Sequence, residues 1–287
     1  MWQQHMRIDF TKMQGAGNDF ILIDNRDGRF PETLCSRIAK QLCRRRFSVG
    51  ADGMMFVERP RENGDYRMVF YNSDGSPGEM CGNGARCVAR YGYEHGLAGE
   101  TQNIETTAGL VRGRRIDEER YRIRLNDVSV MKLGVKPETE AGAEDGVIFC
   151  DYVELGNPGI PHAVVELPGR EMLVPERLRK TAEAIRHSPA FPRGANVNFY
   201  FAGDDGTVEE LTFERGVEDF TYACGTGTGS VAAVLTKRGR IGEGTVQFHM
   251  PGGFLDIEVC KDRQTDKITD LYLTGSAVIV AEGTAIF

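Results

Sequence analysis

Short apolar runs, separated by glycine and polar residues, are the dominant pattern along the chain. Several of them are rich in β-branched and aromatic residues and are bounded by turn formers, which is typical of strands. The expected strands cover residues 20–24, 54–58, 66–71, 121–125, 163–167, 196–201, 211–213 and 277–281. The core is therefore expected to be built mainly from short strands.

Fewer stretches have the spacing of an amphipathic helix. We expect helices over residues 33–46, 86–95, 175–187 and 230–238. The second and the fourth follow glycine-rich turns and end beside Gly96 and Gly239, residues that commonly terminate helices. Many strands with few helices favour an α+β fold over a doubly wound sheet.

An internal repeat is the most informative feature of the sequence. The motif Cys-Gly-x-Gly occurs at Cys81 and again at Cys224, an offset of 143 residues (224 − 81), which is half of the 287-residue chain to the nearest residue. Phe70 and Phe213 share this offset, as do 88–89 with 231–232 and 108–109 with 251–252. The repeat predicts two structurally similar halves, joined between residues 124 and 146.

Each copy of the motif would place a cysteine just before a helix. There the helix dipole and free N–H groups favour negative charge, which would lower the thiol pKa from about 8.5 toward neutrality and bind a carboxylate. Two facing thiols can remove a proton from one side of an α-carbon and return one to the other. Cys81 and Cys224 are therefore the expected acid and base of an amino-acid racemase or epimerase.

Length and charge narrow the classes of function. The 287 residues suit two domains, and the net charge of −7 argues against a nucleic-acid binder. No apolar run is long enough to span a bilayer, and residues 1–10 do not read as a signal peptide. We expect a cytoplasmic protein whose partner is a small amino acid, with neither nucleic acid nor membrane.

The seven cysteines have other possible roles. An odd number in a chain of this size makes a disulfide framework improbable. The Cys81–Cys87 pair has no second pair to complete a zinc site, and the motif is neither a Walker loop nor a dinucleotide fingerprint. Burial as small apolar residues is expected for Cys35, Cys43, Cys87, Cys150 and Cys260.

From about residue 7 to its end the chain resembles the diaminopimelate epimerases. The matching stretches are 12–20 (KMQGAGNDF), 50–53 (GADG), 72–76 (NSDGS), 80–87 (MCGNGARC), 193–199 (RGANVNF), 214–218 (ERGVE), 223–228 (ACGTGT) and 251–253 (PGG). The two cysteine motifs together with Gly-Asn-Asp-Phe are highly specific to this superfamily.

The resemblance implies two pseudo-symmetric domains, each a mixed β-sheet wrapped around a central helix. The first would comprise residues 1–125 plus about 275–287, and the second residues 126–274, with the active site in the cleft between them. The resemblance also implies no cofactor: neither pyridoxal phosphate nor a metal is expected. A homodimer is the assembly it suggests.

The resemblance also assigns the candidate site. Cys81 and Cys224 match the two acid/base cysteines. The residues that match positions holding the substrate are Asn18, Asn72, Asn196, Glu214 and Arg215, and those that match the cradle of the reacting carboxylate are Asn83, Gly84, Gly225 and Thr226. Charge supports part of this assignment, because Glu214 suits a distal ammonium and Arg215 a distal carboxylate.

Two departures from the family pattern concern the substrate. The usual Gly-Asn-Pro-His is replaced by Gly-Asn-Pro-Gly-Ile-Pro-His over residues 156–162, so either Asn157 keeps the substrate contact or Ile160 takes the place of the asparagine. Gly53 stands where many members carry glutamine. His162 would orient the substrate, tune a thiol or make a structural hydrogen bond.

Three hypotheses follow. The first is epimerisation of LL- to meso-diaminopimelate, a step of lysine and cell-wall synthesis. The second is racemisation of another amino acid, such as histidine, glutamate or a proline derivative. The third is a phenazine-pathway-like isomerase or a non-catalytic binding protein on the same scaffold, since fold alone does not fix function. Retention of both cysteines argues against the third.

Overall fold

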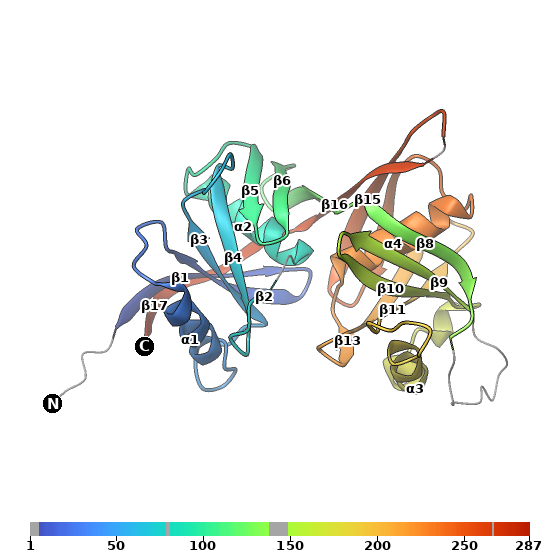
Figure 1. Cartoon of the computed structure of the whole chain (residues 1–287), viewed down its shortest axis with the longest axis horizontal. Helices are drawn as coiled ribbons and strands as arrows, with labels where there is room; N and C mark the ends of the chain where they lie inside the picture. The colour runs from blue at the N-terminus through green and yellow to red at the C-terminus, as the bar shows by residue number, and fades with distance from the viewer. Residues whose placement is uncertain (1–5, 79–80, 138–148, 266) are drawn as a thin grey trace. The chain divides into compact units, whose positions relative to one another are not determined.

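The computed structural model describes residues 6–78, 81–137, 149–265 and 267–287. Its contacts divide the chain into two compact units: unit 1, which is Met1–Ile123 with Thr274–Phe287, and unit 2, which is Arg124–Leu273. Met80, and residues 138–146 of the stretch in which the junction was expected, lie outside the described residues. The chain passes from one unit to the other within β7 and returns within β16 (Figure 1).

Unit 1 is a mixed sheet with a helix on each face. The strands run, in pairing order, β17 (Val278–Ile286), β1 (Arg7–Gly15), β2 (Asn18–Asp24), β3 (Gly53–Glu58), β4 (Tyr66–Asn72), β5 (Thr101–Thr106), β6 (Gly109–Arg115) and β7 (Arg120–Arg124). Parallel pairing occurs between β2 and β3 and between β4 and β5. Helix α2 (Gly82–Glu94) contacts β17, β1 to β4 and β6, so the sheet wraps around it.

Unit 2 repeats this plan. The strands are β8 (Val128–Val135), β9 (Cys150–Gly156), β10 (Gly159–Glu166), β11 (Asn196–Ala202), β12 (Val208–Glu214), β14 (Gly244–Met250), β15 (Gly253–Lys261) and β16 (Ile268–Ser276), with the short β13 (Asp219–Thr221) paired to β12. The β10–β11 and β12–β14 pairs are parallel. Helix α4 (Gly225–Lys237) contacts β8 to β11 and β15 and takes the central place.

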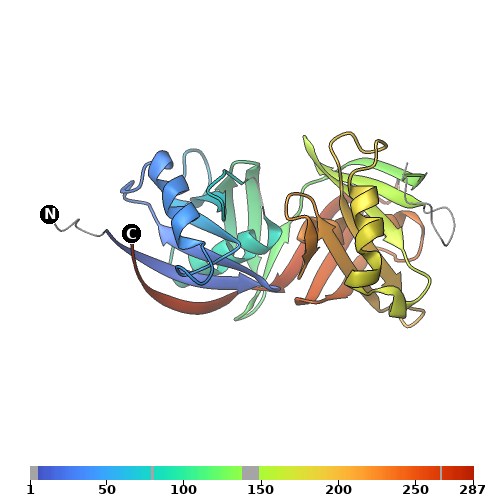
Figure 2. The same ribbon diagram turned by 90° about the horizontal axis from the view of Figure 1, so that it is seen from below.

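The remaining two helices cover the opposite faces of the sheets. Helix α1 (Glu32–Leu42) packs on β3 and β4 through a cluster that includes Ile38 and Phe56. Helix α3 (Pro175–Arg186) packs on β11 and β12 through residues such as Ala182 and Phe199. In Figure 2, α1 (blue) and α3 (yellow) each lie across the sheet of their own unit.

The boundaries of the elements show the duplication directly. Four equivalent pairs of elements begin 143 residues apart: Glu32 and Pro175, Gly53 and Asn196, Gly82 and Gly225, Thr101 and Gly244. This confirms the predicted α+β fold of two similar halves. Strands β4 and β12 begin at Tyr66 and Val208, however, which are 142 residues apart.

That one-residue change in offset corrects one detail of the sequence alignment. Met55 of β3 pairs with Phe70 of β4, whereas Asn198 of β11 pairs with Thr212 of β12. The structural counterpart of Phe70 is therefore Thr212, and the match of Phe70 with Phe213 was wrong. The extra residue of unit 2 lies in the stretch between β12 and α4, which also contains β13.

Other predicted elements needed smaller corrections. The helices expected from residues 86 and 230 begin earlier, at Gly82 and Gly225, because the glycine-rich turns are themselves the first helical turns. Both end as expected, and Gly96 and Gly239 follow with φ of +63° and +69°. The helix expected over 33–46 ends at Leu42.

Nine strands were not expected from the sequence, namely β1, β5, β6, β8, β9 and β13 to β16, and only part of β10, β12 and β17 was expected. In several of them charged residues interrupt the apolar alternation, as in the Gly-Leu-Val-Arg-Gly-Arg-Arg of β6. Such strands have only one buried face, and arginines occupy the other. Within the described ranges, no helix combines the length and the apolar character that a membrane span requires.

Candidate active site

Cys81 and Cys224 each occupy the residue that precedes a central helix. Both have extended backbone, with φ/ψ of −114°/119° for Cys81 and −124°/101° for Cys224. Their carbonyl groups accept the first helical hydrogen bonds, from Ala85 N at 2.8 Å and from Thr228 N at 2.9 Å. The N–H groups of the following turn have no acceptor within the helix and point toward the cysteine end. Each unit therefore presents a thiol beside an anion-binding helix terminus.

The acidity of Cys224 differs from the sequence expectation. Burial raises the pKa of its thiol well above 9.0, and the carboxylate of Glu214 adds to the rise. The hydroxyl of Thr226, whose Oγ1 lies 3.7 Å from the sulfur, and the N–H of Gly227 act in the opposite direction. Lost hydration outweighs the helix terminus here. Cys224 therefore keeps its proton at neutral pH, and the expectation of a lowered pKa was wrong.

The candidate residues of unit 1 gather on the face of the sheet that carries α2. Asn83, in the first turn of α2, donates its side-chain N–H to Oδ1 of Asn18 at the start of β2. Asn72 ends β4, where its Nδ2 donates to Ser76 Oγ at 3.0 Å. Gly84 packs so closely on Met55 that an added Cβ would lie 2.0 Å from Met55 Cε.

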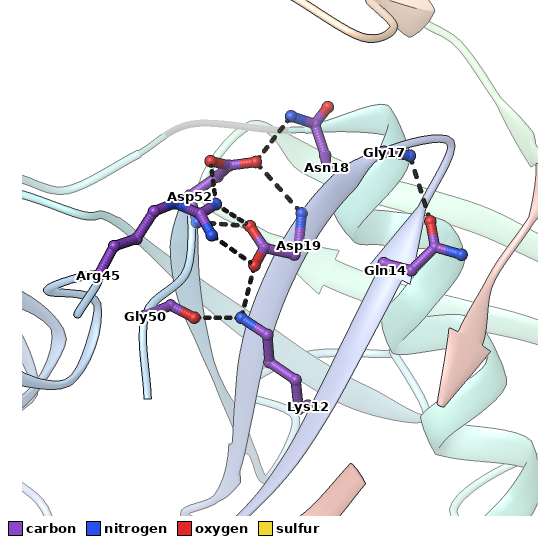
Figure 3. Close-up of polar contacts among 8 residues, drawn as sticks. All are labelled: Lys12, Gln14, Gly17, Asn18, Asp19, Arg45, Gly50 and Asp52. Carbon is purple, nitrogen blue, oxygen red and sulfur yellow. Dashed lines mark hydrogen bonds and ion pairs between the residues drawn. The ribbon is translucent and has the colours of Figure 1, made fainter. Parts of the chain in front are cut away.

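A charged network holds Asn18 from the other side (Figure 3). Nδ2 of Asn18 donates to Asp52 at 3.1 Å, and Arg45 bridges Asp52, at 2.8 Å, and Asp19. Lys12 also pairs with Asp19, at 2.7 Å. Burial would raise the pKa of Asp19, but hydrogen bonds and charge from Arg45 and Lys12 hold it below its usual 3.8. The carboxylate of Asp19 therefore stays ionised.

Sequence analysis did not single out Arg45, Asp19 or Asp52. Asp19 and Asp52 do lie within the stretches Gly-Asn-Asp-Phe and Gly-Ala-Asp-Gly that carried the resemblance. Asp19 stands next to Asn18 and Asp52 next to Gly53, two positions that the resemblance had singled out, and this adjacency was the sequence signal for the two aspartates. Arg45 lies in the basic run Arg44–Arg46, and nothing in the sequence shows that β2 and the segment after α1 meet.

In unit 2, Asn196, Glu214 and Arg215 lie at neighbouring strand ends. Oδ1 of Asn196 accepts from the backbone N of Arg215 at 2.8 Å, and Arg215 Nη1 donates to the carbonyl of Arg193 at 2.9 Å. Glu214 Oε1 accepts from Thr221 Oγ1 at 2.6 Å. Glu214 and Arg215 thus each have a hydrogen-bond partner within unit 2.

His162 and the two competing residues before it have different environments. Asn157 lies in the exposed turn between β9 and β10, whereas Ile160 is half-buried on β10, two residues before His162 and on the same face. His162 is fully buried, and its Nδ1 lies 2.9 Å from Asn198 Oδ1. Burial lowers the pKa of His162 to about 4, so its ring is neutral at physiological pH.

The candidate residues therefore fall into two sets. Unit 1 contains Asn18, Asn72, Cys81, Asn83 and Gly84, and unit 2 contains Asn157, His162, Asn196, Glu214, Arg215, Cys224, Gly225 and Thr226. Within unit 2 the structure brings together the start of α4 and the ends of β10, β11 and β12, while Asn157 lies outside that group in its turn.

The other cysteines are mostly structural. Burial raises the pKa to about 12 for Cys35, Cys43, Cys87 and Cys150. Cys260 is only half-buried on β15, which corrects the expectation of burial. Among the described residues, no group of three His, Cys, Asp or Glu side chains is arranged to hold a metal ion.

Comparison with known proteins decides the family. The family model described as diaminopimelate epimerase matches residues 10–129 and 155–280. The diaminopimelate epimerase of Archaeoglobus fulgidus is 40% identical over 286 residues, covering 97% of this chain and 96% of that protein. The chain belongs to the diaminopimelate epimerase family. All thirteen candidate residues of the family site lie within the two matched ranges.

Further relatives agree. The diaminopimelate epimerase of Methanothrix thermoacetophila is 37% identical over 281 residues, covering 96% of this chain and 95% of that protein. The enzyme of that name from Aquifex aeolicus is 34% identical over 287 residues, covering 96% and 97%.

Solved structures extend the likeness of the fold beyond the family. A phenazine biosynthesis protein of the PhzF family from Bacillus anthracis superposes with a TM-score of 0.75 at 18% identity, covering 98% of this chain and 100% of that one. A probable proline racemase from Agrobacterium radiobacter gives 0.70 at 17% identity, covering 96% and 92%. At these identities the likeness concerns the fold alone.

Proposed function

We propose that the protein epimerises LL-2,6-diaminopimelate to meso-diaminopimelate, with Cys81 and Cys224 as its two acid/base groups. It is then an isomerase that needs neither pyridoxal phosphate nor a metal. The observation that carries the proposal is the repeated cysteine before a helix N-terminus, in a chain of the diaminopimelate epimerase family.

In the proposed reaction the two thiols act on opposite faces of one α-carbon. A thiolate takes the α-proton, the electron pair of the C–H bond is delocalised toward the carboxylate, and the second thiol delivers a proton to the other face. Because Cys224 keeps its proton at neutral pH, it serves as the acid in the direction that uses Cys81 as the base. In the reverse direction the two cysteines exchange roles.

The developing negative charge needs stabilisation. The N–H groups of the first helical turns supply it, from Asn83 and Gly84 in α2 and from Gly225 and Thr226 in α4. These groups are fixed by the helix before the reaction begins, so little reorganisation accompanies the charge.

The remaining candidate residues would bind the distal amino-acid group of diaminopimelate. Glu214 suits its ammonium and Arg215 its carboxylate. Neutral hydrogen bonds would come from Asn18, Asn72 and Asn196, each of which already has a polar side-chain atom fixed by a neighbour.

A second candidate is racemisation of another amino acid, such as histidine. It is favoured by one observation: Ile160, an apolar residue, lies two positions before His162 on β10, and Asn157 lies in an exposed turn. An asparagine contact to the distal group would then be missing.

Cytoplasmic location and homodimer formation stay predictions.

Solvent-hydrogen incorporation followed by NMR tests the proposal. The protein is incubated in D₂O with LL-diaminopimelate and, separately, with a panel of single amino acids. We expect deuterium at the α-carbon and formation of the meso isomer only with diaminopimelate, and loss of both in Cys81→Ala and Cys224→Ala. Cys260→Ala, which changes a half-buried cysteine of β15, is the matched control and should keep full activity.

The other outcomes discriminate between the hypotheses. Inversion of a different amino acid by the same two cysteines would keep the mechanism but change the assigned substrate. Ile160 would then be the first residue to examine as the cause of the different specificity. No exchange with any substrate would refute the epimerase assignment and leave a binding protein or another isomerase on this fold.

A further inference from the structure

The core beneath the first turn of α4 is polar. Strands β10, β11 and β12 contribute His162, Asn198, Glu210 and Thr212, all buried, and these four residues are called the polar layer. Nδ1 of His162 donates to Asn198 Oδ1 at 2.9 Å. Nδ2 of Asn198 lies 3.1 Å from Thr212 Oγ1 and 3.3 Å from Glu210 Oε1. The layer is thus one connected hydrogen-bond network.

The polar layer lies directly against the helix that follows Cys224. A Cβ added to Gly227, in the first turn of α4, would lie 2.2 Å from Nδ2 of Asn198. Thr228, in the same turn, is close enough to influence the ionisation of Glu210, and its hydroxyl donates to the carbonyl of Cys224 at 3.0 Å. The network therefore reaches the backbone of Cys224.

Unit 1 shows that the fold does not require this polarity. By strand pairing, the positions that correspond to Asn198, Thr212 and Glu210 are occupied in unit 1 by Met55, Phe70 and Met68. Helix α2 thus lies on apolar side chains where α4 lies on polar ones. Burying polar groups is unfavourable unless they are fully paired, so the polar layer belongs to the Cys224 side for a reason other than folding.

The carboxyl of Glu210 is the most unusual member of the layer. It is fully buried, and burial raises its pKa to about 8. Its Oε2 has no hydrogen-bond partner among the described residues, and neither has Nε2 of His162. A neutral carboxyl has an O–H to donate, and Thr228 is the neighbour through which that donation would reach α4.

We propose that Glu210 is a positioning residue for Cys224: as a neutral acid it supports the first turn of α4 through Asn198 and Thr228, and a negative charge on it opposes formation of the Cys224 thiolate. The added negative charge acts on the thiolate directly. An ionised Glu210 also attracts the hydroxyl hydrogen of Thr228 away from the carbonyl of Cys224. The proposal rests on the proposed acid/base function of Cys224.

Other titratable groups surround Glu210 on every packed strand. His162 of β10 has its pKa lowered to about 4 and stays neutral at alkaline pH. Tyr200, which pairs with Glu210 from β11, has its pKa raised by burial above the usual range. Glu214 follows on β12, and its charge disfavours the Cys224 thiolate. On β14, the exposed His249 pairs with Glu209, whose side chain points to the other face. Glu210 is the member of this group that changes charge near pH 8.

The rate of thiol alkylation tests the proposal without requiring turnover. Wild type and Glu210→Gln are treated with iodoacetamide between about pH 6.5 and about pH 9.5, and modification of Cys224 and of Cys81 is quantified separately by peptide mass spectrometry. Glutamine keeps the shape and the hydrogen bonds of a neutral carboxyl but cannot ionise. Cys81, in the other unit, is the internal control.

We expect the two proteins to alkylate Cys224 at the same rate near pH 6.5. At about pH 9 the variant should react about three- to tenfold faster, which corresponds to a coupling of about half to one pKa unit. The Cys81 profiles should coincide. Superimposed Cys224 profiles of the two proteins would overturn the proposal.

Two further outcomes keep the proposal separate from the proposed function. If Glu210 and Cys224 are coupled but the protein inverts no amino acid, the proposed function is refuted and the role of Glu210 stands. If the protein inverts diaminopimelate but shows no coupling, only the role of Glu210 is refuted. If Glu210→Gln does not fold, infrared spectroscopy of the wild type decides: a carboxylic-acid carbonyl band present near pH 6.5 must disappear by about pH 9. Absence of that band at the lower pH would contradict the proposal.

Discussion

The buried carboxyl of Glu210 makes the stability of the protein depend on pH in a specific direction. Its pKa rises from 4.5 to about 8 on folding, so between these values the folded protein holds a proton that the unfolded chain releases. Stability therefore falls as pH rises through this window, by about 1.4 kcal/mol per pH unit, and the loss is complete above the folded-state pKa.

His162 acts in the opposite direction at lower pH. Its pKa falls from 6.5 to about 4 on folding, so the unfolded chain binds the extra proton and stability rises with pH between these values. From about pH 4.5 to about pH 6.5 the fall in stability caused by Glu210 and the rise caused by His162 cancel. The buried thiols, such as Cys87 with a pKa near 12, reduce stability only above about pH 9. The interval from 6.5 to 8 thus isolates Glu210, with an expected loss of about 2 kcal/mol.

Urea unfolding at several pH values within this interval measures the effect. Wild type should lose about 2 kcal/mol of unfolding free energy from about pH 6.5 to about pH 8, and Glu210→Gln should lose close to none. Glu183→Gln, which changes an exposed glutamate of α3, should follow the wild type. The reasoning is refuted if wild type shows no decline, or if Glu210→Gln declines in parallel with it.

Three more predictions follow from the two units. Gly227→Ala should lower the unfolding free energy by about 1–3 kcal/mol, because its new Cβ meets the fixed amide of Asn198. Gly84→Ala should change it by less than about 1 kcal/mol, because its Cβ meets only the flexible end of Met55. Equal effects of the two substitutions in urea unfolding would contradict this prediction. Asp52→Asn weakens the Arg45 network behind Asn18, so it should raise KM for diaminopimelate about fivefold or more with a smaller change in kcat. Steady-state kinetics that show a larger change in kcat than in KM would argue against a substrate-positioning role. Arg238→Met removes the two hydrogen bonds, of 2.9 and 2.7 Å, that Arg238 donates to the buried carboxylate of Asp151 and leaves only that from the backbone N of Gly134. Thermal unfolding should then show a loss of about 2 kcal/mol, and an unchanged melting temperature would contradict this prediction.

The repeat made much of the fold predictable. A constant offset between Cys81 and Cys224 located both central helices and both halves, because a duplicated sequence folds into a duplicated plan. Strand β6 was harder to predict, since arginines on its exposed face hide the alternation of the buried positions.

The site shows where sequence reasoning stops. Strand β12 was expected only over residues 211–213, so Glu210 lay outside the predicted strand and was not singled out. Its burial follows from pairing with β11 and packing under α4, which are long-range consequences of the fold. The thiol acidity of Cys224 was misjudged for the same reason: the helix terminus is visible in the sequence, and the loss of hydration is not.

The source of the hydrogen in the first product molecules tests the two-thiol account most directly. LL-diaminopimelate is converted to a few per cent in D₂O, and the α-position is examined in the product and in the recovered substrate. Because Cys81 and Cys224 would act on opposite faces, we predict deuterium in the product and protium in the recovered substrate. A product that retains the hydrogen of its own substrate would mean that one group moves the proton across, and would contradict the account.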